Sequence, residues 1–269
     1  MQPADTAIAF RRVSYQLPNG RAVLQDLTFE IPSGEILVLL GRSGSGKTTA
    51  LKLVNRLLEP SSGEIVVHGR STRDWDTIEL RRHTGYAIQE VGLFPHYSVG
   101  RNIALLPEIE HWPKQRIAER VDELLKLVGL RAEITARYPH QLSGGQRQRV
   151  GVARALAADP PLLLMDEPFG ALDAQTRSEM QQLLLQIWDE TACTILFVTH
   201  DVEEAIYLAD RIFIMSSHPG TIVEDVQVPF DRPRDLGLKE KSEFHDLQHY
   251  VLGSLKRAPG IGGHVRVSV

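Results

Sequence analysis

The sequence predicts an α/β fold organised around a parallel sheet, and three observations support this prediction. Segments 36–40, 162–165 and 194–198 are short and almost uniformly apolar, as expected of strands that are buried on both faces. A helical pattern at about 175–190 separates the last two, which is the order of a parallel crossover unit. A glycine-rich turn joins the first segment to another helical pattern.

The amino-acid composition and net charge exclude or disfavour several classes of protein. The 269 residues are 42% hydrophobic and 24% charged, which excludes a disordered chain, and the net charge of −4 argues against a general nucleic-acid binder. A single cysteine, Cys193, cannot form an internal disulfide, so a reducing compartment is expected. No apolar run approaches the ~18 residues that span a bilayer, and no secretory signal is visible at the N-terminus. We expect a soluble, cytoplasmic chain that needs a partner to work at a membrane.

The N-terminal elements are predicted from alternation and turn residues. Segments 8–17 and 22–31 alternate in polarity and are separated by Pro18-Asn19-Gly20, which predicts a half-exposed antiparallel sheet. After the glycine-rich turn, Leu51, Val54 and Leu58 recur at helical spacing. A turn at 60–63 ends that helix, and a short strand is expected at 64–69.

Residues 98–158 are predicted to be mostly helical. One amphipathic helix ends near Gly129, and another runs from about Gln146 to Ala158, where Asp159 and two prolines stop it. Beyond Thr221 the patterns predict one strand (222–228), a final helix (242–255) and a loose tail (258–269).

The glycine-rich turn is a candidate phosphate-binding loop. Residues 41–48 fit G-x-x-x-x-G-K-T between a buried strand and a helix. Its glycines turn backbone N–H groups toward phosphate oxygens, its lysine brings a charge to the β- and γ-phosphates, and its threonine can ligate Mg²⁺. The candidate residues are Gly41, Ser43, Gly44, Ser45, Gly46, Lys47 and Thr48. This motif alone leaves kinases, GTPases and motors possible.

Two further motifs carry chemistry. Asp166 and Glu167 end an apolar strand, where Asp166 can hold Mg²⁺ and Glu167 can orient or deprotonate an attacking water. A second anion site is expected at a helix start formed by Ser143, Gly144, Gly145 and Gln146, with Ser143 as the N-cap. Capping alone would also explain this second motif.

The motifs in combination resemble the ATP-binding subunit of an ABC transporter. LSGGQRQR (142–149), LLLMDEPFGALD (162–173), VTH ending at His200 and AIQEVGLFPH containing Gln89 carry the resemblance, which runs over residues 7–220. It implies a P-loop NTPase fold with a RecA-like parallel-sheet core, an N-terminal antiparallel β-subdomain and an inserted α-helical subdomain at about 90–158. Residues 221–269 would then form a short C-terminal extension.

The resemblance also implies roles for individual residues. Tyr15 would stack on adenine, and Ser43 to Thr49 would wrap the phosphates of ATP. Glu167, His200, Lys47 and Gln89 would form the catalytic group, in which His200 contacts the γ-phosphate and Glu167 is the general base. Mg²⁺ would be bound by Thr48, Gln89 and Asp166. Ser143, Gly144, Gly145 and Gln146 would bind ATP held on the opposite subunit, and Asp173 would cross the dimer interface.

The implied partners follow from the same resemblance. Two copies, arranged head to tail, would enclose two ATP molecules. Residues Val91, Gly92, Leu93, Phe94, Pro95 and His96 would dock an integral membrane permease, and Leu93, Phe94 and Pro95 are expected to form an exposed apolar patch. A solute-binding protein would act indirectly, nucleic acid would not be a partner, and the chain would sit peripherally at the cytoplasmic face of the plasma membrane.

The transporter class is read from longer stretches. Residues 56–60 and 79–96 resemble the ATPases of osmoprotectant importers (glycine betaine, choline, quaternary amines), whereas residues 212–235 resemble those of nitrate, sulfonate and taurine importers. An exporter ATPase is an alternative. A soluble ABC ATPase acting on DNA or ribosomes is disfavoured because neither a long coiled coil nor a second cassette is present. A P-loop kinase or GTPase would not explain the element at 143–145.

Overall fold

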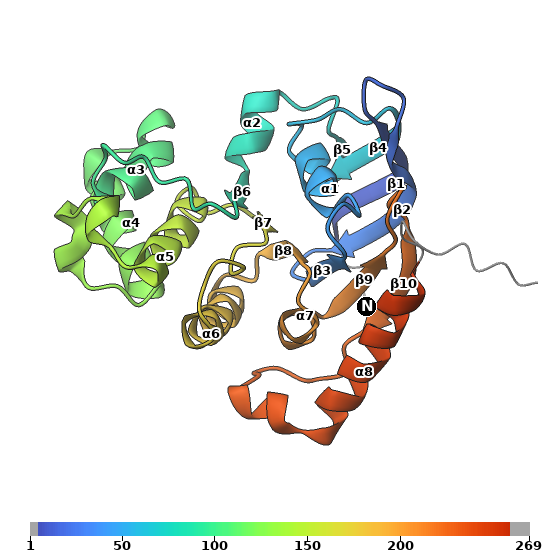
Figure 1. Ribbon diagram of the computed structural model, residues 1–269. Helices are drawn as coiled ribbons and strands as arrows, with labels where there is room; N and C mark the ends of the chain where they lie inside the picture. The colour runs from blue at the N-terminus through green and yellow to red at the C-terminus, as the bar shows by residue number, and fades with distance from the viewer. Residues whose placement is uncertain (1–4, 259–269) are drawn as a thin grey trace, which may run out of the picture.

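The computed structural model describes residues 5–258, which form two sheets (Figure 1). The smaller sheet is antiparallel, in the order β2-β1-β4-β5. Its strands are β1 (Thr6–Gln16), β2 (Ala22–Pro32), β4 (Ser62–Val67) and β5 (Arg70–Ser71). This confirms the antiparallel N-terminal sheet that alternation predicts. The expected tail lies outside the described residues apart from residue 258.

The larger sheet has the order β10-β9-β3-β8-β7-β6 and is parallel except for β10. Its strands are β3 (Ile36–Gly41), β6 (Thr84–Ala87), β7 (Leu162–Asp166), β8 (Thr194–Thr199), β9 (Arg211–Met215) and β10 (Ile222–Gln227). β7 and β8 are parallel neighbours joined through a helix, so the predicted crossover unit is confirmed. The strand expected in an extension after residue 220 is the edge strand β10 of this sheet.

Eight α-helices and three 3₁₀ turns are formed within residues 5–258. They are α1 (Lys47–Val54), α2 (Thr77–Arg82), α3 (Val99–Ile109), α4 (Lys114–Leu127), η1 (Ala132–Ala136), η2 (Pro139–Gln141), α5 (Gly144–Ala155), α6 (Ala174–Thr191), α7 (Val202–Leu208), η3 (Leu236–Glu240) and α8 (Ser242–Arg257). α1 ends before Leu58, so the helix expected through that residue is wrong: Asn55 closes α1, and Leu58 packs from the following turn.

The larger sheet is covered on both faces because its strands alternate apolar side chains between two clusters. Leu37 and Leu39 of β3 pack with α1 and the smaller sheet. Ile36, Val38 and Leu40 of the same strand pack with helices on the opposite face. This explains why the core strands read as continuous apolar runs rather than as alternating ones.

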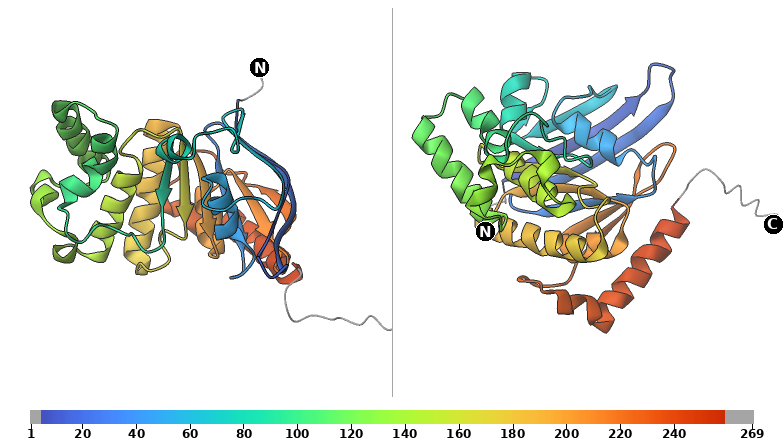
Figure 2. Two further views of the ribbon diagram at one scale, coloured as in Figure 1. Left: turned by 90° about the horizontal axis from the view of Figure 1, so that it is seen from above. Right: turned by 60° about the vertical axis from the view of Figure 1, so that its left-hand side comes forward.

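The remaining helices form two peripheral parts. α3, α4 and α5 make a lobe beside the larger sheet, away from the N-terminal strands (Figures 1 and 2). α8 packs against α7, η3 and β9, on the face opposite the smaller sheet. No helix among residues 5–258 combines the length and apolarity needed to cross a membrane.

Candidate functional site

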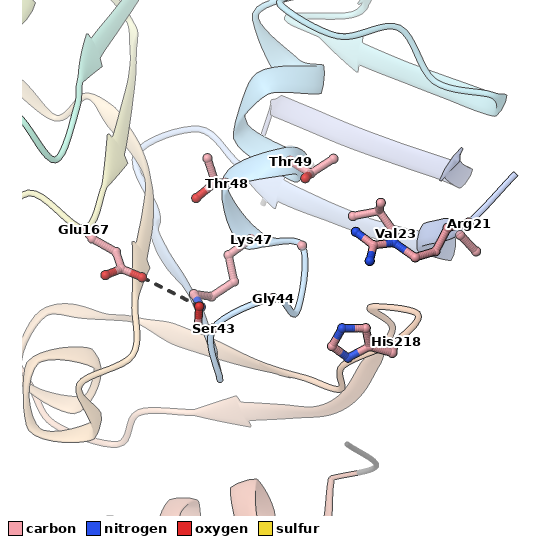
Figure 3. Close-up of a pocket in the computed structure, with 11 residues that line it drawn as sticks. Arg21, Val23, Ser43, Gly44, Lys47, Thr48, Thr49, Glu167 and His218 are labelled. Carbon is pink, nitrogen blue, oxygen red and sulfur yellow. Dashed lines mark ion pairs between the residues drawn. The ribbon is translucent and has the colours of Figure 1, made fainter. Parts of the chain in front are cut away.

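The phosphate-binding loop lies between β3 and α1 and lines a cavity of about 240 Å³ (Figure 3). Gly44 and Gly46 have φ of +82° and +88°, which L side chains rarely adopt. A Cβ at Gly46 would also lie 2.4 Å from Leu24 Cδ2, so only glycine fits there. The lining residues are Arg21, Ala22, Val23, Ser43, Gly44, Gly46, Lys47, Thr48, Thr49, Glu167 and His218.

Lys47 begins α1 and is the buried cation of this loop. Its Nζ donates to the carbonyls of Gly41 (2.8 Å) and Arg42 (3.1 Å) and lies 3.9 Å from Glu167 Oε1. Burial lowers the pKa of Lys47, and the charges of Glu167 and Asp166 oppose this shift. A cation buried at 4% exposure beside backbone N–H groups suits a multiply charged phosphate chain.

Thr48 and Asp166 meet across the site, as the two motifs require. Thr48 Oγ1 donates to Asp166 Oδ1 at 2.8 Å. Burial raises the pKa of Tyr86 on β6 to about 12, and the charge of Asp166 adds to this shift. Burial raises the pKa of Asp166, while the Thr48 hydrogen bond lowers it. A hydroxyl paired with a carboxylate fits Mg²⁺, which is held by one or two protein ligands, phosphate oxygens and water. Tyr86 was not predicted from the sequence.

Glu167 and His200 form the polar wall of a second cavity, of about 580 Å³. His200 Nδ1 donates to Glu167 Oε2 at 2.9 Å. Glu167 has a positive φ of +45°, a conformation that is uncommon for non-glycine residues. The full lining is Gly41, Arg42, Ser43, Glu167, His200, Leu252, Leu255 and Lys256, so α8 supplies the opposite wall.

The serine-glycine motif forms a different cavity, of about 340 Å³. Ser143 Oγ accepts from Gln146 N (3.2 Å), and Gln146 Oε1 accepts from Ser143 N (3.0 Å), so the motif is a capping box for α5. Asp173 lines the same cavity and caps α6 by accepting from Thr176 N at 3.0 Å. Backbone and side-chain hydrogen bonds from Thr176 lower the pKa of Asp173. One chain thus presents the phosphate-loop cavity and the Ser143 cavity as two separate surfaces.

Four expected site residues are not among the residues that line these cavities: Asp166, whose contacts are given above, Tyr15, Gln89 and Ser45. Tyr15 is half-buried on β1 against the apolar cluster of the smaller sheet. Gln89 is exposed just beyond β6. Ser45 is buried, and its Oγ has no hydrogen-bond partner among the described residues. Their adenine, metal and side-chain phosphate contacts stay predictions.

The segment expected to dock a permease is held against the helical lobe. Arg154 of α5 donates to the carbonyls of Val91 and Gly92, both at 2.7 Å. The buried Asn102 side chain accepts from Phe94 N and donates to Phe94 O. Phe94 is 40% exposed, but Leu93 packs on the larger apolar cluster. Phe94 and Pro95 of the expected apolar patch are therefore exposed, whereas Leu93 is only partly exposed.

The cavity walls that sequence reasoning missed come from segments distant in the chain. Arg21 to Val23, His218 and the α8 residues carry no motif of their own. The only signal for α8 is its amphipathic pattern, which predicts a helix without saying what it faces.

Sequence comparison identifies relatives of this chain. Residues 24–170 match the profile of the family described as ABC transporter. The choline transport ATP-binding protein OpuBA of Bacillus subtilis (strain 168) is 49% identical over 247 residues, 92% of this chain and 64% of that protein. The taurine import ATP-binding protein TauB of Roseobacter denitrificans is 43% identical over 226 residues, 83% of this chain and 81% of that protein. The chain thus spans less than two thirds of OpuBA.

Solved structures that resemble this chain are also ATP-binding cassettes or parts of ABC transporters. The cassette MJ0796, in a dimeric post-hydrolysis state bound to ADP and Pi, is 30% identical with a TM-score of 0.73, covering 83% of this chain and 100% of that one. CbiO1 from Clostridium perfringens, part of the transporter complex cbiONQ, is 28% identical with a TM-score of 0.79, covering 94% and 97%. With its phosphate loop, its acidic strand end and its capped serine-glycine helix, the chain belongs to the ABC transporter family of ATP-binding proteins.

Proposed function

We propose that the chain is the ATP-hydrolysing subunit of an importer for small quaternary amine osmoprotectants. The observation that carries the ATPase part is the Glu167–His200 pair at 2.9 Å, which stands beside the buried Lys47 of the phosphate loop. The importer part is supported by relatives at 49% and 52% identity, OpuBA and the glycine betaine uptake protein YehX of Escherichia coli (strain K12).

Hydrolysis follows from the placement of these groups. Glu167 accepts a proton from a water molecule, whose oxygen attacks the terminal phosphorus as the bond to the β-phosphate oxygen breaks, releasing ADP and phosphate. His200 holds the Glu167 carboxylate in one orientation through its Nδ1 hydrogen bond. Thr48 and Asp166 would hold Mg²⁺, which neutralises phosphate charge when it is bound.

A dimer would complete each ATP site. The cavity at Ser143 is separate from the phosphate-loop cavity, so a single chain does not bring its two anion-binding surfaces onto one phosphate chain. In a head-to-tail pair, the Ser143 helix start of one subunit meets the ATP on its partner. ATP then favours the closed pair through contacts that ADP lacks. The MJ0796 cassette, dimeric in a post-hydrolysis state with ADP and Pi, supports the formation of a dimer.

A separate membrane permease is the proposed partner, and the chain would act at the cytoplasmic face of the plasma membrane through it. Phe94 and its neighbours in segment 91–96 offer the docking surface, since Arg154 and Asn102 fix the backbone of that segment. A rigid, partly apolar segment is suited to transmitting movement of the helical lobe.

Taurine-type import is the second candidate. Residues 212–235 resemble the ATPases of taurine-type importers, and TauB is 43% identical over 83% of this chain. The solute is recognised by other subunits, and identity within the ATPase is therefore indirect support for either solute.

Uptake in the native cell tests the proposal. A strain that carries Lys47→Ala in place of the wild-type chain is compared with wild type for uptake of labelled choline, glycine betaine and taurine. Loss of choline or betaine uptake alone supports the proposal, and loss of taurine uptake alone selects the second candidate. Unchanged uptake of all three would reject both, and co-purification of ribosomal proteins or nucleic acid would favour a soluble ATPase.

A further inference from the structure

The loop between β9 and β10, residues 216–221, forms one wall of the phosphate-loop cavity although it contains no nucleotide-binding motif. His218 lines the same cavity of about 240 Å³ as Gly44 and Lys47. In Figure 3 its ring points toward Gly44, and it lies on the side of Lys47 away from Glu167. The loop therefore borders the part of the site remote from the hydrolytic pair.

Hydrogen bonds fix this loop to β2. Gly220 N donates to Val23 O at 2.8 Å, and Gln25 N donates to Gly220 O at 3.0 Å, so the loop continues the edge of β2. Within the loop, Thr221 N donates to Ser216 Oγ at 3.0 Å. The wall that carries His218 is thus held by backbone bonds and is not a free surface segment.

The loop also packs closely on the phosphate loop itself. A Cβ at Gly220 would lie 2.1 Å from Ser45 O, so only glycine allows this approach. A Cβ at Gly44 would lie 3.5 Å from His218 Cε1, which places the imidazole in van der Waals reach of the loop that turns around the phosphates. His218 itself has a φ of +61°, a conformation that residues with a side chain adopt uncommonly.

The second basic group on this side is Arg21, from the turn before β2. Within residues 5–258, neither the Arg21 guanidinium nor the His218 ring makes a hydrogen bond or ion pair with another protein group. Both can donate hydrogen bonds, and both line a cavity whose other wall is built to bind phosphate. Glu167 marks the terminal-phosphate end, so these donors face the nucleoside end.

We propose that His218, assisted by Arg21, donates a hydrogen bond to the α-phosphate of the bound nucleotide. The inference rests on the proposed function, because the proposed position of Glu167 sets the direction of the phosphate chain. ADP and ATP share the α-phosphate, so the contact contributes equally to the binding of both. A contact at the terminal phosphate would act on the triphosphate alone.

The test measures affinities of the full chain for ADP and for a non-hydrolysable ATP analogue by calorimetry with Mg²⁺ present. His218→Gly removes the ring and relieves the positive φ, so it isolates the side chain. We expect it to weaken both ligands by the same factor, roughly three- to tenfold, as loss of one hydrogen bond predicts. His218→Asn keeps a donor and tolerates the same backbone conformation, so most of the affinity is expected to return. His249→Ala, at an exposed position on α8, is the control.

Hydrolysis gives a second readout. The expected His218→Gly enzyme has a raised KM for ATP and an unchanged kcat. Wild-type affinities in that variant overturn the proposal, and so does a loss confined to the triphosphate analogue. Equal losses in the Gly and Asn variants, with a lowered Tm of the nucleotide-free protein, would assign the ring to loop packing instead. Normal turnover in Glu167→Gln would contradict the catalytic assignment and leave these binding results intact.

Discussion

Replacing Glu167 by glutamine keeps the shape of the side chain but removes its charge and its ability to accept a proton from water. The amide oxygen can still accept the His200 Nδ1 hydrogen bond that the carboxylate accepts at 2.9 Å. The positive φ at position 167 is unchanged by the substitution, so the strand end keeps its conformation. We expect Glu167→Gln to separate ATP binding from hydrolysis.

The size of each effect follows from the site. Loss of a general base lowers kcat by about 10²–10⁴-fold, which corresponds to about 3–5 kcal/mol of activation free energy. Glu167 Oε1 lies 3.9 Å from Lys47 Nζ, and a charge pair at that distance interacts by about 4 kcal/mol at an effective dielectric constant of 20. Glu167 is 21% exposed, so solvent reduces this figure. Removing the carboxylate also removes its repulsion of the phosphates, and ATP affinity is expected to stay equal or rise.

The assay combines steady-state phosphate release with sedimentation of the purified chain in Mg-ATP and in Mg-ADP. Glu190→Gln, at the exposed end of α6, is the matched control because it makes the same chemical change away from the site. The Glu167→Gln chain should sediment as a dimer with ATP and as a monomer with ADP. Turnover within tenfold of wild type, or a chain that stays monomeric in ATP, would refute the reasoning.

Three further outcomes are expected. Asn102→Ala removes the hydrogen bonds between a buried amide and the backbone of Phe94. The free energy of unfolding should fall by about 3 kcal/mol, and calorimetry should show a Tm lowered by roughly 10 °C. An unchanged Tm would contradict the anchoring role of Asn102. Phe94→Asp should preserve nucleotide affinity and abolish permease stimulation of the ATPase, whereas normal coupled transport would exclude this docking surface. Burial raises the pKa of Glu204 from 4.5 to about 7. The protonated carboxyl therefore contributes stability that is present below pH 4.5, and roughly 2–3 kcal/mol of it should be lost as the pH rises to 7. Urea titrations should show that the free energy of unfolding depends less on pH in Glu204→Gln than in wild type, and parallel pH profiles would disprove the shift.

Hydrophobic patterns in the sequence predicted most of the buried strands and helices. They failed where the structure of a segment depends on its packing against distant parts of the chain. The apolar runs at β3, β7 and β8 predicted buried parallel strands because these strands meet apolar clusters on both faces. β6 and β9 were not predicted: β6 has only four residues, and β9 has only five and begins at the charged Arg211, directly after Asp210. The helix expected through Leu58 stops at Val54, since periodicity does not distinguish a helical turn from a following loop that packs on the same cluster.

Leu93 illustrates the same limit at a surface. A Leu-Phe-Pro run reads as one apolar patch, but only the folded helical lobe determines which side chain turns inward. Phe94 is exposed because Asn102 pins its backbone, and that bond joins residues eight positions apart. No composition or spacing rule contains this information.

The sequence by itself determined the chemistry of the nucleotide site, because the phosphate loop, the acidic strand end and the capped helix are each encoded in a few consecutive residues. Thr48 and Asp166, 118 positions apart, meet because Asp166 ends β7 and Thr48 follows β3, and the carboxyl ends of these parallel strands lie at one edge of the sheet. Only the tertiary structure decided which residues form the other walls of the two cavities beside the phosphate loop. His218, Arg21 and the α8 side chains reach the site through a loop, a turn and a helix that packing across the sheet brings there, and such contacts leave no local pattern in the chain.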